Sequence, residues 1–482
     1  MKRFLNHLVA EELDGRGEHL RGAALAMDVF GRGGDFDSNN DPVVRIEAGK
    51  LRKALEHYYL TSGSLDEIRI DVPKGQYRPR FSKVQRASLK PNGQTVSAKP
   101  SIGVCGFDGE VGDLSALFCQ GLPEEIALEL SRFDNLRVYS GWSKGREKDG
   151  QSLAVQCDYT LNGSVRVSGP NMRITVQLTR LPDDLLIWSE RFTTVLGETD
   201  VFEIQEGVAR QCATRIADAY GVVGDDLAAG YAGRDVTDAS VYGALLAFHG
   251  HLRTNRLGSL KEFVALAEAA VLASPQSGLA HALLALGILD QFFFGKLSHD
   301  TLLKLGAGHA EQAVALSPQG QEALFAGAVY ALLQQDQARF QRLVDAAISV
   351  NPNGNLLIAL AGGWIAILGD AAKGAELVQQ ALQGNPILPV WTNITLALED
   401  VENERFAAAS TKICNIDARD CANDWLLIAA MHALAGENSR AHLALRQFSR
   451  AGLGAEQQLS NLPMRPDLAE AMKTALRRVQ VK

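Results

Sequence analysis

The chain has 482 residues, of which 46% are hydrophobic and 22% charged, a composition that excludes a fibrous or an intrinsically disordered protein. The net charge of −8 is uneven, because residues 1–100 carry 17 Lys and Arg against 13 Asp and Glu, which gives +4 there and leaves −12 for the remainder. No stretch approaches the ~18–20 apolar residues of a membrane span, and the six cysteines form no Cys-x-x-Cys pair. We therefore expect about three domains in the cytoplasm, no membrane partner, no zinc site, and a mildly basic N-terminal part suited to nucleic acid.

The first predicted domain covers residues 1–81. Apolar residues recur at helical spacing over 4–13 and 20–30, and a loop rich in glycine and aspartate follows. Asp41 has the features of an N-cap and Pro42 those of a first helical residue, which predicts a third helix over about 42–60. Alternation at Ile68, Ile70 and Val72, with β character continuing to residue 81, predicts a hairpin. Three helices followed by a hairpin is the order of a winged-helix domain.

The predicted third helix has an apolar stripe and a basic face. Lysine and arginine pair with phosphates and, on an inserted helix, with guanine edges. Gly49 lies within this helix at a cost of ~1 kcal/mol relative to alanine, so the helix either kinks there or allows a close backbone approach. A solvated face on a domain for protein interaction or dimerisation is the alternative, since Glu47 and Glu56 lie among the bases. The candidate DNA-contacting residues are Arg45, Lys50, Arg52 and Lys53 on the helix and Lys74 at the tip of the hairpin.

A linker and a second domain follow. Residues 82–100 hold four basic residues and no acid, which predicts a mobile basic tether. Residues 101–222 alternate between strand and helix patterns, with Gly169-Pro170 as a hairpin turn. They predict an α/β domain with a mixed sheet, whose strands lie at 102–107, 136–139, 159–168, 171–180 and 185–192 and whose helices lie at 122–133 and 201–220.

The third region, residues 235–482, is rich in alanine and leucine and is predicted to be all helical. Prolines at 275, 318, 352 and 386 each follow a helix end, at intervals of 43, 34 and 34 residues. A helix-turn-helix period of 34 residues that ends in proline is typical of the tetratricopeptide (TPR) repeat. Such pairs stack into a superhelix, and we expect the first helix of each pair to line a concave binding face.

Few residues carry a pattern typical of metal binding or catalysis. Alternating oxygen ligands at residues 35–41 resemble a calcium loop, but Asn40 and Ile46 replace the required glycine and glutamate. His249 and His251 face different directions on a helix, and we interpret both as helix-surface residues. The carboxylates Asp108, Glu124, Glu125 and Glu190 show no pairing pattern and are expected to be solvated. We find no catalytic motif, and we predict no enzyme activity, no cofactor and no metal.

Segments of the first two regions resemble known protein families. The first region resembles an OmpR-type winged helix through Leu51-Arg52 and through Gly75-Gln76-Tyr77. The second resembles the TolB-like amino-terminal domain that precedes TPR repeats in many bacterial regulatory proteins. The segments that carry this resemblance are 121–125, 159–165, 187–192 and 201–205. Some such relatives carry a class III nucleotide cyclase domain in front, for which we find no counterpart.

The resemblance implies a multidomain α and α+β protein: a winged-helix head, a mixed-sheet middle domain and a C-terminal all-α TPR superhelix. It implies a DNA-binding transcriptional regulator whose array docks a protein or peptide, and a homodimer is compatible with it. A TPR scaffold or adaptor, whose head mediates protein interaction, is the alternative. A protein associated with nucleotide cyclases is a weaker one.

Overall fold

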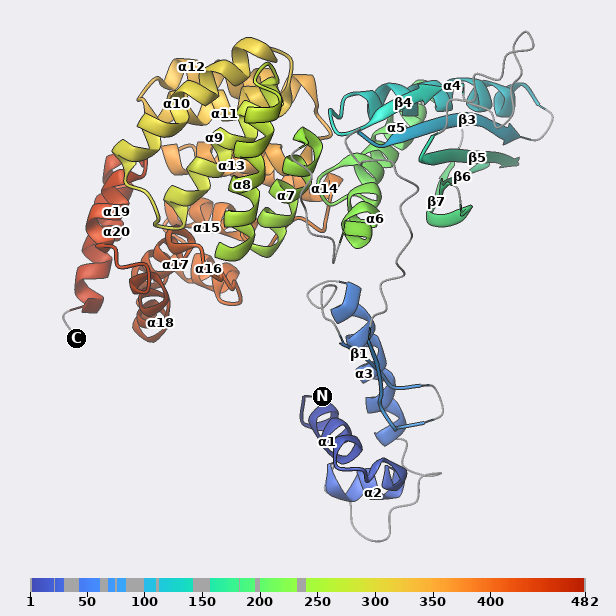
Figure 1. The fold of residues 1–482 in the computed structure, drawn as a ribbon, viewed down its shortest axis with the longest axis horizontal. Coiled ribbons are helices and arrows are strands. Elements are labelled where there is room, and N and C mark those ends of the chain that lie inside the picture. Colours follow the sequence, from blue (N-terminus) through green and yellow to red (C-terminus); the bar gives the residue numbers. More distant parts are fainter. Residues whose placement is uncertain are drawn as a thin grey trace. The chain divides into compact units, whose positions relative to one another are not determined.

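The computed structural model describes residues 2–20, 22–29, 43–60, 68–73, 76–83, 99–109, 112–141, 157–181, 183–195, 200–231 and 240–480. The chain divides into an N-terminal unit, residues 1–93 with 232–234, and a main unit, residues 94–231 with 235–482. The predicted middle domain and helical region thus belong to one unit (Figure 1). The calcium-loop residues 35–41 and most of the predicted linker lie outside the described residues.

The N-terminal unit has the predicted order of three helices and a two-stranded antiparallel hairpin, in which Ile68 lies opposite Lys83. Its core joins Phe4 and Leu8 of the first helix to the third helix. The apolar stripe of that helix is buried as predicted at Val44, Ala48, Leu51 and Leu55. The bounds are α1 (Lys2–Leu13), η1 (Gly17–His19), α2 (Gly22–Asp28), α3 (Val43–Leu60), β1 (Ile68–Asp71) and β2 (Arg80–Lys83).

Helix α3 continues through Gly49. A methyl group built on this glycine would meet no atom within 4 Å. No packing contact with the described chain therefore requires glycine at this position.

The main unit begins with a five-stranded mixed sheet of order β4-β3-β5-β6-β7. Strand β3 is parallel to β4 and β5, and the two remaining pairs are antiparallel. The predicted bounds of β5 and β6 are confirmed, whereas α4 begins nine residues earlier than expected and contains Pro123. The bounds are β3 (Ser101–Gly109), α4 (Asp113–Ser131), β4 (Arg137–Ser140), β5 (Tyr159–Ser168), β6 (Asn171–Arg180), β7 (Leu185–Val195), α5 (Val201–Ala217) and α6 (Val222–Tyr231).

One face of this sheet is buried. Along β6 the exposure alternates, with Met172, Ile174, Val176 and Leu178 turned into the core. Helices α4 and α5 pack against each other, and their apolar residues share this core with the sheet. The alternation follows from the two-residue period of a strand with one solvated face.

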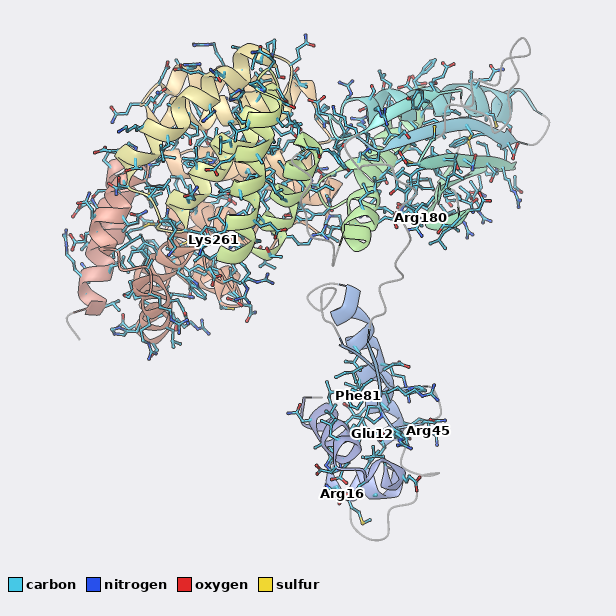
Figure 2. The ribbon with its side chains drawn as sticks, in the orientation of Figure 1. Glu12, Arg16, Arg45, Phe81, Arg180 and Lys261 are labelled. Atoms are coloured by element: carbon cyan, nitrogen blue, oxygen red, sulfur yellow. The ribbon has the colours of Figure 1, made fainter. Side chains whose placement is uncertain are left out.

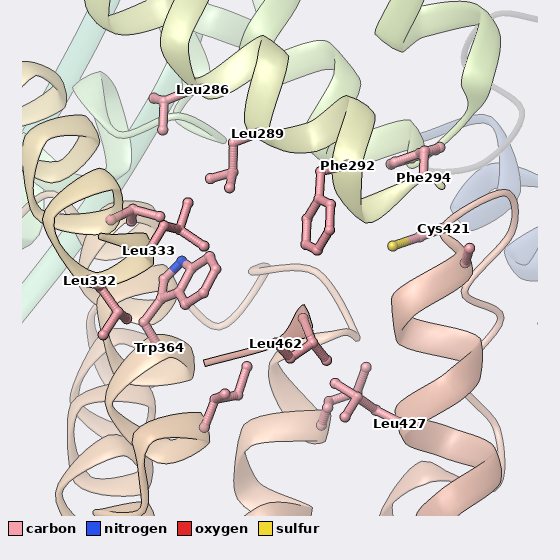
Figure 3. Close-up of a cluster of buried hydrophobic side chains, with 14 of the residues drawn as sticks. Leu286, Leu289, Phe292, Phe294, Leu332, Leu333, Trp364, Cys421, Leu427 and Leu462 are labelled. Carbon is pink, nitrogen blue, oxygen red and sulfur yellow. The ribbon is translucent and has the colours of Figure 1, made fainter. Parts of the chain in front are cut away.

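The rest of the main unit is an array of helical hairpins whose buried side chains form one continuous cluster (Figure 3). Consecutive helices pack in pairs, and neighbouring pairs stack. The bounds are α7 (Val241–Thr254), α8 (Leu257–Ala273), α9 (Gly278–Phe293), α10 (His299–Leu316), α11 (Gln321–Leu333), α12 (Gln337–Val350), α13 (Asn355–Leu368), α14 (Ala371–Gly384), α15 (Thr392–Glu402), α16 (Phe406–Ile413), α17 (Ala422–Leu434), α18 (Asn438–Ser449), α19 (Ala455–Asn461) and α20 (Pro466–Gln480).

The periodic prolines stop four helices in the same way. Helices α8, α10, α12 and α14 each end one residue before a cap that is followed by proline. A residue before proline is disfavoured in the α conformation, so the helix cannot continue. The four caps, Ser274, Ser317, Asn351 and Asn385, share φ of −138° to −135° and ψ of 67° to 93°. The predicted helix ends are confirmed, and the hairpins continue beyond them to residue 480.

The α/β part and the array meet at a seam of hydrogen bonds and apolar contacts. Asn385 Nδ2 donates to Asp218 Oδ2 at 2.8 Å, and Asn353 Nδ2 donates to Glu129 Oε2 at 2.5 Å. Both asparagines lie in loops that follow the second helix of a hairpin, and both acceptors belong to the α/β part. The apolar residues of the seam form one buried cluster: Ala219, Tyr220, Leu356, Ile358, Ala359, Val378, Ala381 and Leu388.

Candidate nucleic-acid interface

Two of the predicted DNA-contacting residues are exposed on α3. Arg45 lies at the surface, off the buried stripe (Figure 2). Lys50 has a side chain that is 58% exposed, and its Nζ lies 2.7 Å from Glu47 Oε1. This hydrogen bond lowers the pKa of Glu47. An exposed ion pair of this kind contributes only ~0–1 kcal/mol, so a phosphate oxygen can replace the glutamate as the partner of Lys50.

Arg52 has a structural role that the sequence did not reveal. Its Nε donates to Val72 O at 2.7 Å, and its Nη2 donates to Pro73 O at 3.0 Å and to Gln76 O at 2.9 Å. These carbonyls lie on both sides of residues 74 and 75, so one guanidinium ties both ends of the turn between β1 and β2 to α3. No side-chain pattern marks these partners, because all three are backbone carbonyls.

The remaining predicted contacts stay predictions. The side chain of Lys53 and all of Lys74 lie outside the described residues. The hairpin also carries two exposed arginines outside the predicted set of DNA-contacting residues, Arg78 and Arg80. Arg78 Nε lies 2.7 Å from Glu12 Oε2, which ties the hairpin to α1. Arg80 stands opposite Asp71 in the register of the hairpin.

The histidines of α7 differ from each other. The interpretation of His251 as a helix-surface residue is wrong, since its side chain is 1% exposed and its Nε2 lies 3.4 Å from Asp290 Oδ2. Its Nδ1 lies 3.2 Å from Ser259 Oγ. Helices α8 and α9 both pack against α7 and cover this position. His249 is partly exposed, and burial lowers its pKa to about 3.

The acids singled out in the middle domain lie apart from one another in their surroundings. Asp108 and Glu124 are exposed, and Glu190 Oε2 lies 3.8 Å from Arg215 Nε. Within the described ranges, no group of three or more His, Cys, Asp or Glu side chains is placed to hold a metal ion. None of the helices found there is both long and apolar enough to cross a membrane.

The expected concave face is filled in the middle of the array. In α11, the first helix of its pair, every residue except Glu322 is buried. The side chains of α9, α11, α13 and α17 meet in the interior, where Phe292, Trp364 and Leu427 lie (Figure 3). Leu462, from the loop after α19, belongs to the same cluster. The expectation that first helices line an open groove is therefore wrong for this part, because later helices close over the interior.

Comparison with known proteins gives one partial relative. No protein-family model matches the sequence. The chain is similar to a protein named "Putative adenylate cyclase 3" from Rhizobium meliloti (strain 1021), with 34% identity over 122 residues. This match covers 23% of the chain and 20% of that protein, so the chain matches about a fifth of the relative's length.

Proposed function

We propose that the protein is a non-enzymatic DNA-binding regulator. Its N-terminal unit would be an OmpR-type winged helix, and the main unit a TolB-like domain joined to TPR-like repeats. The observation that carries the proposal is the arrangement of α3 and the hairpin. The apolar stripe of α3 is buried, Arg45 and Lys50 are exposed, and Arg52 holds the turn that bears Lys74.

The dimensions and charges of α3 support this function. Its 18 residues give a rod of about 27 Å, and a major groove about 12 Å wide admits such a helix. Arg45 and Lys50 flank the face opposite the buried stripe, where Gly49 leaves open space. The regulator would contact phosphates through these cations and bring base edges close to the backbone at Gly49.

The array would dock a protein or peptide on its outer side. The filled interior leaves the second helices of the hairpins as the accessible surface. In α12 only Phe340, Val344 and Ala347 are buried, and they form a single stripe. The opposite side of α12 is therefore available to a partner.

The DNA proposal can be tested with the full chain and a fluorescent duplex of mixed sequence. We expect Arg45→Ala/Lys50→Ala to weaken binding at least tenfold at low salt. It should also reduce the slope of log affinity against log salt by about 2, since each phosphate contact contributes ~0.9. The matched control is Lys261→Ala/Lys304→Ala, which removes two exposed charges from the array. Absence of binding at low salt, or an equal loss in the control, would contradict the proposal.

The partial relative favours a second candidate. An adaptor that shares one segment with a cyclase-named protein would act in nucleotide signalling without binding DNA. Failure of the duplex to bind would favour this adaptor. Incubation with ATP and analysis of the products separates both from an enzyme, because sustained formation of a cyclic nucleotide would overturn the non-enzymatic proposal.

A further inference from the structure

A cavity of about 230 Å³ lies at the seam within the main unit. One wall comes from the segment after α4 and from the end of α5, and includes Arg132, Asn135 and Asp218. The other comes from the array and includes His249, Glu322 and Asn351. The volume is somewhat below the ~300–1,000 Å³ of sites for drug-sized ligands, so the cavity fits a small metabolite.

The walls of the cavity are short of positive charge. Three carboxyl groups line it, from Asp134, Asp218 and Glu322, against the single guanidinium of Arg132. That guanidinium is already engaged, because its Nε lies 3.0 Å from Glu129 Oε2. The lining histidine, His249, adds no positive charge at neutral pH, because burial lowers its pKa to about 3.

Among the hydrogen-bonding groups of the walls, acceptors without a partner outnumber donors without one. Asn135 Nδ2 donates to Ala217 O at 2.8 Å, and Gln321 Nε2 donates to Asn351 O at 2.9 Å. In contrast, Asn135 Oδ1 and Glu322 Oε2 are shielded from solvent and accept no hydrogen bond from the described residues. Buried acceptors without a donor are rare in folded proteins. Arg132 Nε also makes no hydrogen bond although it lies in an ion pair, so two acceptors and one donor are open at the cavity.

Apolar side chains complete the cavity. Phe133, Phe248, Leu356 and Leu357 line it beside the polar groups. Aromatic faces attract organic cations as well as alkyl groups. A ligand with a cationic head and a short apolar chain matches both kinds of wall.

We propose that this cavity binds a small organic cation, an ammonium or guanidinium group on a short apolar chain. Glu322 is its carboxylate partner and Asn135 supplies a second acceptor. Glu322 is partly exposed and lines the cavity. Because the two acceptors belong to opposite walls, the ligand bridges the α/β part and the array.

The acidic groups in the walls should couple binding of the cation to release of a proton. Burial raises the pKa of Glu322 to about 7, with Asp134 raising it further and Lys99 opposing this effect. Burial also raises the pKa of Asp218 to about 6. The cations near the cavity each lie beside a carboxylate: Arg132 beside Glu129, Lys99 beside Asp134 and Arg253 beside Asp225. A cation requires the ionised carboxylate, so binding releases a proton, and the affinity rises between pH 6 and pH 8.

Calorimetric titration of the full chain with butylammonium tests the proposal, with 1-pentanol as a neutral ligand of similar size. We expect saturable binding of butylammonium at one site, about tenfold tighter at pH 8 than at pH 6, and no comparable binding of the alcohol. Equal affinity for the alcohol, or no saturable binding of the cation, would overturn the proposal.

Variants of single residues test whether the cation binds in this cavity. Glu322→Gln keeps the shape and removes an unpaired buried charge, so it should fold, which circular dichroism can verify, and it should weaken binding at least tenfold at pH 8. Asn135→Ala should weaken binding less. Glu311→Gln, an exposed acid of α10, is the matched control and should bind as the parent does. Unchanged affinity in Glu322→Gln would refute this location.

Discussion

Replacing Arg52 with alanine should loosen the hairpin of the N-terminal unit. The side chain makes three hydrogen bonds, at 2.7, 3.0 and 2.9 Å, to carbonyls around the turn. A hydrogen bond from a charged donor contributes about 1.5–3 kcal/mol. The three bonds share one partly exposed side chain, so we expect the free energy of opening the hairpin to fall by about 2–4 kcal/mol in total. This change corresponds to roughly 30- to 700-fold more frequent opening.

Hydrogen exchange measured on peptides covering residues 68–83 of the full chain reads this opening directly. Arg52→Lys should lose most of the protection too, because one ammonium cannot span three carbonyls. Arg78→Ala is the control, since it removes an exposed ion pair with Glu12 that contributes at most ~1 kcal/mol. Unchanged exchange in Arg52→Ala, or an equal effect of Arg78→Ala, would refute the view that Arg52 holds the turn.

Three further predictions concern single positions. Gly306→Ala should lower the melting temperature, because the added methyl group would clash with the Tyr330 hydroxyl. Gly308→Ala is the control and should raise the melting temperature, because its methyl group would meet no atom within 4 Å. Asp218 has a pKa raised to about 6 by burial, so its contribution to stability is fully present below about pH 4 and is lost as the pH rises through 6. The free energy of unfolding should therefore fall by about 3 kcal/mol between pH 4 and pH 7 because of this group, and Asp218→Asn should remove that fall. Denaturant titrations at the two pH values measure the difference. Gly49→Ala should stabilise the N-terminal unit by about 0.5–1 kcal/mol and weaken duplex binding, and unchanged binding would show that α3 does not approach DNA closely there.

The sequence predicted the local structure better than it predicted which residues are neighbours in three dimensions. The order of elements in residues 1–83, the bounds of β5 and β6 and the helix ends before proline all follow from short-range patterns. The burial of His251 does not follow, because a helical period identifies one buried face but not a second helix packed on the other side. For α11, the run from Ala323 to Leu333 is apolar on every side, and that composition could have indicated a fully buried helix.

The candidate site was predictable in part. Arg45 and Lys50 are exposed as expected, since they lie off an apolar stripe that a period of 3.6 residues identifies. The role of Arg52 was hidden, because its partners are backbone carbonyls about twenty residues away and no side-chain pattern marks them. The seam cavity was hidden for a similar reason, since Asn135 and Glu322 are 187 positions apart in the sequence.

The seam also limits how this protein can evolve. Two of its hydrogen bonds come from the loops that begin with Asn351-Pro352 and Asn385-Pro386, whereas the loop that begins with Ser317-Pro318 contributes Gln319 to the lining of the seam cavity. If recombination joined the α/β part to a different array, Asp218 would remain buried without Asn385 and the apolar cluster around Tyr220 would be uncovered. Residues 94–482 should therefore be inherited together. The N-terminal unit, which has its own core, can be exchanged between relatives without that penalty.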